Sequence, residues 1–323
     1  MSSSIDPVPR PSSPRTRLER SYVILETLVT LPPLPHVNKR LDPKEIVDEF
    51  ISDLRQDLQN NGIQIPTLPD ISIQALFTIN RDDSSIDEIT AVVARDTAMA
   101  ARLIRYANSP IYRGLSRCTT IKSAITRLGL EKTKNVVLTL AMRDVFNTGH
   151  RGIRSRMEAL WNHSVEVAIL SSLLAWQYRH LDQEVALLAG LVHDVGVIPI
   201  LNKAKNIDVI VENEKYLDMI IASLHMSVGR AILKAWNFDQ QMIDVAAEHD
   251  NLKRDPGDDA PIDYVDIVQA ANIESYQSTG HRLAKVDRLS VPSLRRLGCT
   301  PEDPTLHWDA DQAAMEQVSR IFM

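Results

Sequence analysis

Hydrophobic residues recur every three or four positions along most of this chain of 323 residues. That spacing places them on one face of a helix, whereas a half-buried strand would alternate apolar and polar residues. The first clear case is residues 42–61, with Asp42 and Pro43 at the predicted start and Gly62 at the predicted end. Its apolar stripe is wide enough to be buried, either against the rest of the chain or in a dimer contact.

Short helices are predicted in series after this segment. Ser85 and Glu88 form a predicted capping box, Asp96 or Thr97 is the predicted start of the next helix, and Thr120 is the predicted cap of the one after it. Gly129 is a typical helix end. These punctuation residues stand between runs of apolar positions with helical spacing, so they predict where each helix begins and ends.

Prolines and glycines are scarce where the helices are expected. Ten of the 17 prolines lie at or before Pro69, only Pro110 and Pro199 occur between residues 70 and 255, and the whole chain has 11 glycines. A stretch so poor in helix breakers predicts an all-α fold. The predicted helices of its second half follow a basic link at 150–156 and cover residues 157–178, 183–195, 215–236, 240–249 and 264–276.

Composition and charge narrow the class of protein. The apolar fraction of 44% is enough for a sizeable core, and the net charge of −6 opposes the neutralisation of phosphates on which DNA binding depends. Cys118 and Cys299 lie outside any CxxC pair, which fits a reducing cytoplasm. We expect no membrane span, because the longest apolar run, residues 185–201, is interrupted by His193 and Asp194.

The candidate chemistry lies in four histidines on the predicted apolar faces of four different helices: His163, His193, His225 and His249. One histidine on an apolar face is usually a core residue bonded to a backbone carbonyl. Here the intervals are each about one helix long, and Asp194 directly follows His193. The four helices could therefore bring imidazole and carboxylate ligands for a metal ion to one point.

This ordered set of histidines and Asp194 resembles the signature of the HD superfamily of metal-dependent phosphohydrolases. Motifs in the rest of the chain are similar to those of one branch, the HDOD (HD-related output domain) family. They are Ile65-Pro66-Thr67-Leu68-Pro69, residues 95–103, 107–109, 120–125 and 128–129, Leu160-Trp161-Asn162-His163-Ser164 and residues 189–196. The resemblance implies an all-helical output domain of bacterial signal-transduction proteins, most of whose members are not shown to be enzymes.

The resemblance covers about residues 63–275 and implies an HD-superfamily-like bundle of helices in two lobes. It also suggests how the chain is divided. In chain order we expect a disordered, proline-rich tail (1–20), an N-terminal extension with one amphipathic helix (21–62), the HDOD-like domain with its lobes (63–147 and 157–275), and a C-terminal extension (276–323) with a helix at 310–322.

Several positions depart from the catalytic members of the superfamily, among them Asn272, Val197 and Asp250. The last metal ligand of active enzymes is an aspartate where this chain has Asn272. The relatives that cleave cyclic dinucleotides carry a lysine at the position of Val197 and a second histidine at that of Asp250. An amide oxygen binds cations more weakly than a carboxylate and leaves the site one negative charge short. We therefore expect no binuclear site.

A weak site for one metal ion is still compatible with the resemblance. We expect at most one divalent transition metal, iron or manganese, and no other cofactor. If the protein is an enzyme, His193 and Asp194 are the expected catalytic residues. The expected ligands are His163, His193 and Asp194, with His225, His249 and Asn272 lining the site.

The leading hypothesis is a cytoplasmic regulatory module without robust catalysis, which receives its signal from a separate signalling protein. A small nucleotide-like ligand and a homodimer are left open, and neither DNA nor a membrane is an expected partner. The alternative is a metal-dependent phosphohydrolase that acts on a phosphodiester or a phosphomonoester. Stoichiometric metal, with turnover that is lost in His193→Ala, would favour the alternative.

Overall fold

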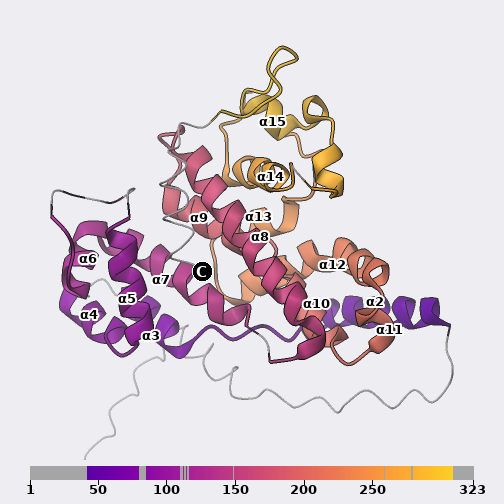
Figure 1. Cartoon of the computed structure of the whole chain (residues 1–323), viewed down its shortest axis with the longest axis horizontal. Helices are drawn as coiled ribbons and strands as arrows, with labels where there is room; N and C mark the ends of the chain where they lie inside the picture. The colour runs from indigo at the N-terminus through magenta and orange to yellow at the C-terminus, as the bar shows by residue number, and fades with distance from the viewer. Residues whose placement is uncertain are drawn as a thin grey trace, which may run out of the picture. The chain divides into compact units, whose positions relative to one another are not determined.

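The described part of the chain is built from helices, and no strand occurs in it (Figure 1). The structure is a computed structural model, and it describes residues 42–79, 85–109, 112, 114, 116–147, 149–257, 259–277 and 279–307. The predicted all-α fold is confirmed. The predicted tail at residues 1–20 and the predicted helix at 310–322 lie outside the described residues.

The helices follow one another along the chain without a strand between them in the described residues. Their order is α2 (Pro43–Gln59), α3 (Asp70–Ile79), α4 (Ile86–Val93), α5 (Thr97–Ala107), α6 (Ile121–Leu128), α7 (Leu130–Val145), α8 (Arg151–Ala175), α9 (Gln183–Val192), α10 (Val197–Ala204), α11 (Asp208–Val211), α12 (Glu214–Ala235), α13 (Gln240–Glu248), α14 (Tyr264–Ser275) and α15 (Pro292–Arg296). Two 3-10 helices, η1 (Arg282–Lys285) and η2 (Arg288–Ser290), lie between α14 and α15.

The predicted helix starts are confirmed at their caps. The Ser85 side chain accepts a hydrogen bond from the backbone N–H of Glu88, and the Glu88 side chain accepts one from the N–H of Ser85. The Asp96 side chain likewise caps α5, and the Thr120 side chain caps α6. A cap of this kind stabilises a helix by about 1 kcal/mol. The starts of these short helices are therefore encoded locally.

Among the predicted helix boundaries that are wrong, two have a clear physical cause. Asn61, rather than Gly62, takes the left-handed conformation after α2, with a φ of 54°. Asparagine adopts this region more readily than most other residues, so the glycine is not required there. The predicted basic link at 150–156 is helical from Arg151 onward. Helix α8 begins there because its first turn also carries the fully buried Ile153, which anchors that turn to the core.

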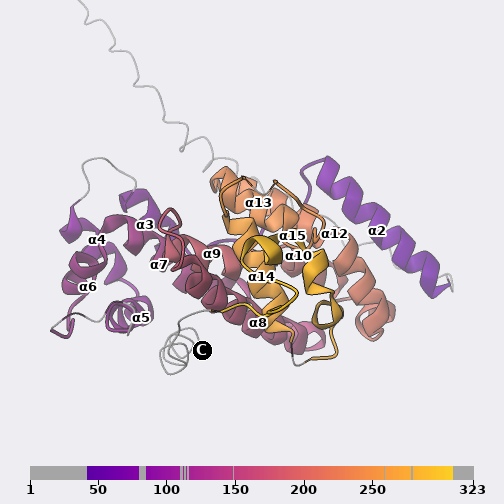
Figure 2. The same ribbon diagram turned by 90° about the horizontal axis from the view of Figure 1, so that it is seen from above.

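Helices α8 and α9 lie at the centre of the helical body. α8 packs along α9 and α14, and α7 packs against α9 and leads to the group formed by α3 to α6 (Figure 1). α12 packs against α13, α10 and α2, and Figure 2 shows α2 beside α12. Gly190 permits the close approach of α8 and α9, because a Cβ atom there would lie 2.6 Å from the Cα of Ala168.

A second glycine lets the start of α10 touch α12. A Cβ atom on Gly196 would lie 2.0 Å from the backbone oxygen of His225, which is far closer than non-bonded atoms can approach. Glycine is therefore required at this contact. The contact places His225 beside the turn that carries His193 and Asp194.

Two stretches, Gln183–Ala204 and Glu214–Ala235, have the length and apolar composition of a membrane-spanning helix. In the first, 89% of the apolar window is buried inside the protein, and in the second 44% is buried. The core helices of globular proteins have the same length and composition. Neither stretch therefore argues for a membrane span.

Candidate functional site

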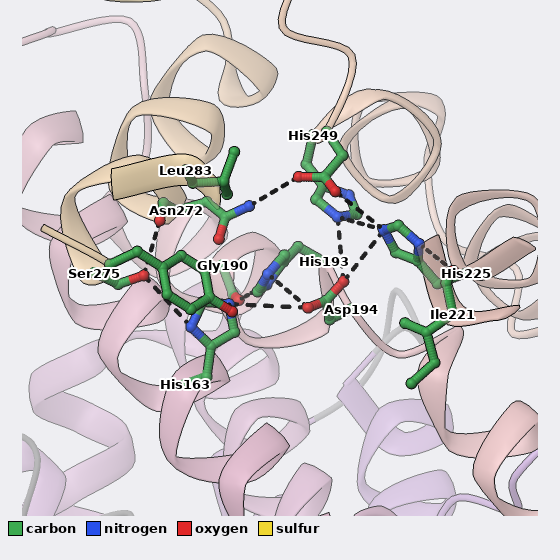
Figure 3. Close-up of polar contacts among 12 residues, drawn as sticks. His163, Gly190, His193, Asp194, Ile221, His225, His249, Asn272, Ser275 and Leu283 are labelled. Atoms are coloured by element: carbon green, nitrogen blue, oxygen red, sulfur yellow. Dashed lines mark hydrogen bonds and ion pairs between the residues drawn. The ribbon is translucent and has the colours of Figure 1, made fainter. Parts of the chain in front are cut away.

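The four predicted histidines and Asp194 converge in the structure (Figure 3). His163 comes from the middle of α8, and His193 and Asp194 directly follow the last residue of α9. His225 lies within α12, and His249 directly follows the last residue of α13. Helices that are far apart in the sequence thus supply one cluster of imidazoles around a carboxylate, which we call the histidine cluster.

The histidine cluster is buried on one side and reaches solvent on the other. His193, His225 and His249 are 0%, 4% and 1% exposed. The side chains of His163 and Asp194 are 13% and 17% exposed. Solvent therefore reaches the cluster on the side of His163 and Asp194.

Three of the imidazoles are held in one orientation by their own helices. In each, Nδ1 lies close to a backbone carbonyl three or four residues earlier. Because a carbonyl oxygen only accepts hydrogen bonds, Nδ1 carries a proton, and the neutral form of each imidazole has its lone pair on Nε2. The pairs are His193 Nδ1 with Gly190 O (2.7 Å), His225 Nδ1 with Ile221 O (2.7 Å) and His249 Nδ1 with Val245 O (3.2 Å).

Asp194 joins two groups of potential metal ligands. Its Oδ2 atom lies 3.3 Å from His193 Nε2 and 3.8 Å from His163 Nε2, and these three residues form the first group. Its Oδ1 atom lies 3.2 Å from His249 Nε2 and 3.6 Å from His225 Nε2, and these form the second group. Within each group, the ligand atoms all lie within 4.8 Å of one another.

The atoms of the histidine cluster fit a metal ion. The Nε2 atom of His193 is buried without a hydrogen-bond partner, and the Nε2 atoms of His225 and His249 face each other at 3.2 Å. Two nitrogen lone pairs at that distance repel each other unless a proton or a cation lies between them. Ligand atoms about 2.1 Å from one ion are roughly 3–3.6 Å apart, and the second group matches this spacing. Imidazole and carboxylate donors suit a divalent transition metal.

The electrostatics of the cluster also favour metal-binding protonation states. Burial would raise the pKa of the Asp194 carboxyl, but its interactions with His193 and His249 outweigh burial and hold that pKa well below its usual range. Burial, and then the neighbouring His193, lower the pKa of His163 to about 4. At neutral pH the cluster therefore presents an ionised carboxylate and a neutral His163, the forms that bind metals.

Asn272 lies beside the cluster, and its amide faces Asp250. Asn272 Nδ2 donates a hydrogen bond to Asp250 Oδ1 at 3.3 Å, whereas Asn272 Oδ1 is buried without a hydrogen-bond partner. The other oxygen of Asp250 lies 3.7 Å from His225 Nε2 and pairs with the guanidinium of Arg282. A second carboxylate therefore borders the second group.

The sequence patterns do not indicate the residues that cover the cluster. The ring of Tyr276 stacks between those of His163 and His281, with centroid distances of 4.6 Å and 3.8 Å. Tyr276 follows Asn272 by about one helical turn, and this spacing is a signal that could identify it. His281 and Arg282 lie in the segment after α14, where apolar residues show no helical spacing.

Two solved structures and one sequence relative resemble this chain. A "putative metal-dependent phosphohydrolase" from Shewanella amazonensis SB2B is 26% identical, with a TM-score of 0.74, over 86% of this chain and 100% of that one. An HDOD domain protein of unknown function from Geobacter sulfurreducens is 25% identical, with a TM-score of 0.57, over 86% and 94% of the two chains. An uncharacterized protein of Treponema pallidum is 24% identical over 221 residues, 65% of this chain. That match spans only 42% of the Treponema protein, less than half of its length.

The model of the HDOD domain family matches residues 65–252, which is more than half of the chain. The matched range contains the whole histidine cluster and Asp250. Asn272, Tyr276 and Arg282, which cover the cluster, lie beyond it. The chain belongs to the HDOD domain family.

Proposed function

We propose that this chain is a regulatory HDOD module that acts by binding, without robust hydrolysis. One observation carries the proposal: the histidine cluster has the donors for a cation, yet it is largely covered, with only His163 and Asp194 partly exposed. His193, His225 and His249 are at most 4% exposed, and Tyr276 and Arg282 contact the remaining side. A covered cluster favours binding and a structural response over the repeated entry of a substrate.

The surroundings of the cluster lack what phosphoester hydrolysis requires. A phosphoryl group in transfer is stabilised by cationic or hydrogen-bonding groups aimed at its developing charge. Val197, at the position of the lysine in catalytic relatives, is part of the buried apolar core. The guanidinium of Arg282 is already paired with Asp250. These neighbours support a site that holds a ligand better than it turns one over.

We propose at most one weakly bound ion, iron or manganese, and no other cofactor. Such an ion supplies Lewis-acid chemistry when it is bound. The chain's own part is to orient the donors: backbone carbonyls fix the imidazoles of His193, His225 and His249. Because residues of the cluster come from α8, α9, α12 and α13, binding or release of an ion there would alter the packing of all four helices.

The partners that we propose are based on the net charge of the chain and on its membership of the HDOD domain family. The signal comes from a separate signalling protein in a bacterial cytoplasm, and a small nucleotide-like ligand and a homodimer stay open as further partners. The net charge of −6 disfavours DNA. Binding of an identified partner, measured by calorimetry with wild-type protein and with a cluster variant, tests whether the cluster transmits the signal.

A second candidate function, a metal-dependent phosphohydrolase, is favoured by one observation. Two groups of potential ligands share the carboxylate of Asp194, and metal-assisted hydrolysis needs such donors around an ion. The Shewanella protein with 26% identity carries the name of such an enzyme. This alternative predicts turnover of phosphodiesters or phosphomonoesters.

One assay separates the two functions. Purified wild-type protein and His193→Ala are incubated with Mn²⁺ or, anaerobically, with Fe²⁺, and then with bis(p-nitrophenyl) phosphate and p-nitrophenyl phosphate. The regulatory proposal expects wild-type turnover equal to that of His193→Ala. Turnover that requires added metal and disappears in His193→Ala would overturn it in favour of the phosphohydrolase.

A further inference from the structure

The first and second groups are not equally available to an ion. In the second group, the Nε2 atoms of His225 and His249 face Asp194 Oδ1 and each other, at 3.2 to 3.6 Å. In the first group, the Nε2 atom of His163 has another partner. It lies 3.4 Å from the hydroxyl of Tyr276.

Hydrogen-bond directions show what Tyr276 does to His163. The hydroxyl of Ser275 donates to the backbone oxygen of Asn272 at 2.8 Å, so its oxygen can accept from His163 Nδ1, which is 3.4 Å away. With its proton on Nδ1, His163 has a lone pair on Nε2. The Tyr276 hydroxyl therefore donates to that lone pair. An ion in the first group would need the same lone pair.

Tyr276 is held in this position from both sides. Its ring lies between those of His163 and His281. Arg282, which directly follows His281 in the sequence, pairs with Asp250 at the other end of the cluster. Tyr276, His281 and Arg282 are thus anchored beside both groups. These residues lie outside residues 65–252, the part that matches the family model.

The second group has an additional carboxylate beside it. Asp250 Oδ2 lies 3.7 Å from His225 Nε2, and its Oδ1 accepts a hydrogen bond from Asn272. Hydrogen bonds from neighbouring side chains orient ligands around metals in this way. Asp250 therefore places, at the end of α13, a carboxylate beside the second group, and it shares that carboxylate with the guanidinium of Arg282.

We propose that Tyr276 makes the histidine cluster a one-metal site in the second group. The ion binds Asp194, His225 and His249, with Asp250 beside them, and the Tyr276 hydroxyl closes the group of His163 and His193. This inference rests on the single weakly bound ion of the proposed function. The sequence predicts the ion on His163, His193 and Asp194, whereas this inference places it on the other side of Asp194, at Oδ1 with His225 and His249.

The decisive experiment counts Mn²⁺ ions. Chelator-treated full-length protein is titrated with Mn²⁺, and free Mn²⁺ is read from its electron paramagnetic resonance signal. We expect one ion per wild-type chain and two in Tyr276→Phe, which keeps the ring stack and removes the hydroxyl. Tyr264→Phe is the matched control, because Tyr264 lies at the other end of α14 and accepts a hydrogen bond from Asp182 N. It should bind one ion.

Three results of the titration would overturn the proposal: two ions in the wild type, one ion in Tyr276→Phe, or no ion in the wild type. The last result would leave the regulatory module untouched, because that proposal is tested by turnover and by partner binding. Conversely, metal-dependent turnover that is lost in His193→Ala would overturn the regulatory module, whichever group holds the ion.

A second set of variants locates the single ion. His225→Ala should weaken Mn²⁺ binding at least about 100-fold and Asp250→Asn about 10-fold, whereas His163→Ala should change it less than about threefold. Circular dichroism verifies folding, and His225→Gln replaces the alanine variant if that one does not fold. Loss of the ion in His163→Ala with retention in the His225 variant would place the ion in the first group and overturn the proposal.

Discussion

Two carboxylates at opposite ends of α9, one fully buried and one partly exposed, have opposite electrostatic environments. Glu184 lies in the first turn with a side chain that is 0% exposed, and burial raises the pKa of its carboxyl. Asp194 follows the other end, where His193 and His249 outweigh burial and hold its pKa well below the usual range. Lys132 on α7 faces Glu184, with its Nζ atom at 3.2 Å and 41% of its side chain exposed.

The difference shows that neighbours, more than burial, distinguish a binding site from a structural contact. Around Asp194, imidazole side chains converge from several helices, and the interactions of His193 and His249 with the carboxyl outweigh its burial, so the carboxylate stays ionised and can hold a cation. Around Glu184, one partly exposed ammonium group approaches. Glu184 and Lys132 form a contact between α9 and α7. Because the carboxyl group of Glu184 is buried, ionising it lowers the stability of the fold.

The largest expected effect is a loss of stability at the Asp194 end. In Gly196→Ala, the new Cβ would lie 2.0 Å from the oxygen of His225 and 2.5 Å from the nitrogen of Gly229, both backbone atoms. Helices α10 and α12 would have to separate, so we expect the free energy of unfolding to fall by about 3 kcal/mol. Urea unfolding followed by circular dichroism measures it.

Gly149→Ala is the control for this overpacking. Nothing lies within 4 Å of a Cβ atom at Gly149, so its effect should stay below about 0.5 kcal/mol. Equal stability of the Gly196 and Gly149 variants would show that the close approach of α10 to α12 does not hold the histidine cluster together.

The second largest effect separates the two carboxylates by metal affinity. Asp194→Asn removes the charge that both ligand groups share, so we expect Mn²⁺ binding to weaken at least about 100-fold. Glu184→Gln is the matched variant at the other end of α9 and should bind Mn²⁺ as the wild type does. Calorimetry measures both affinities. A similar loss in the two variants would mean that overall charge, and not the cluster, attracts the ion.

Local signals predict the helices of this fold well, and they fail where packing decides. The caps at Ser85, Asp96 and Thr120 depend on nearby residues and were predictable. The start of α8 depends on the burial of Ile153 against distant helices. Helices α3, α10, α11 and α15 have no individual prediction; α10, for example, carries Pro199 within its first turn.

The site divides in the same way. Helical spacing predicts which imidazoles point inward, so the convergence of the four histidines on Asp194 was predictable. The direction of each oxygen of Asp194 depends on how α9, α12 and α13 cross, which spacing does not encode. Tyr276 and Arg282 reach the cluster through the path of the chain after α14, and no periodic pattern indicates that path.

A smaller effect tests the Glu184 end by pH. Because burial raises the pKa of Glu184, its contribution to stability is fully present below the ordinary value of 4.5 and is lost as the pH rises through the raised value. Glu184→Gln removes this dependence. Its free energy of unfolding relative to wild type should therefore increase as the pH rises from about 4 to about 7. A constant difference across this range would contradict the raised pKa.

The smallest expected effect concerns Lys132, the partner of Glu184. Lys132→Met keeps the apolar length of the side chain and removes the charge, and solvent already screens the partly exposed ammonium group. We expect the free energy of unfolding to fall by less than about 1 kcal/mol at neutral pH. The fall should be smaller still in high salt or in the Glu184→Gln background. A double-mutant cycle by urea unfolding measures the coupling. Coupling above about 3 kcal/mol, as in a fully buried pair, would mean that Glu184 is as firmly paired as Asp194, and the contrast between the two ends of α9 would fail.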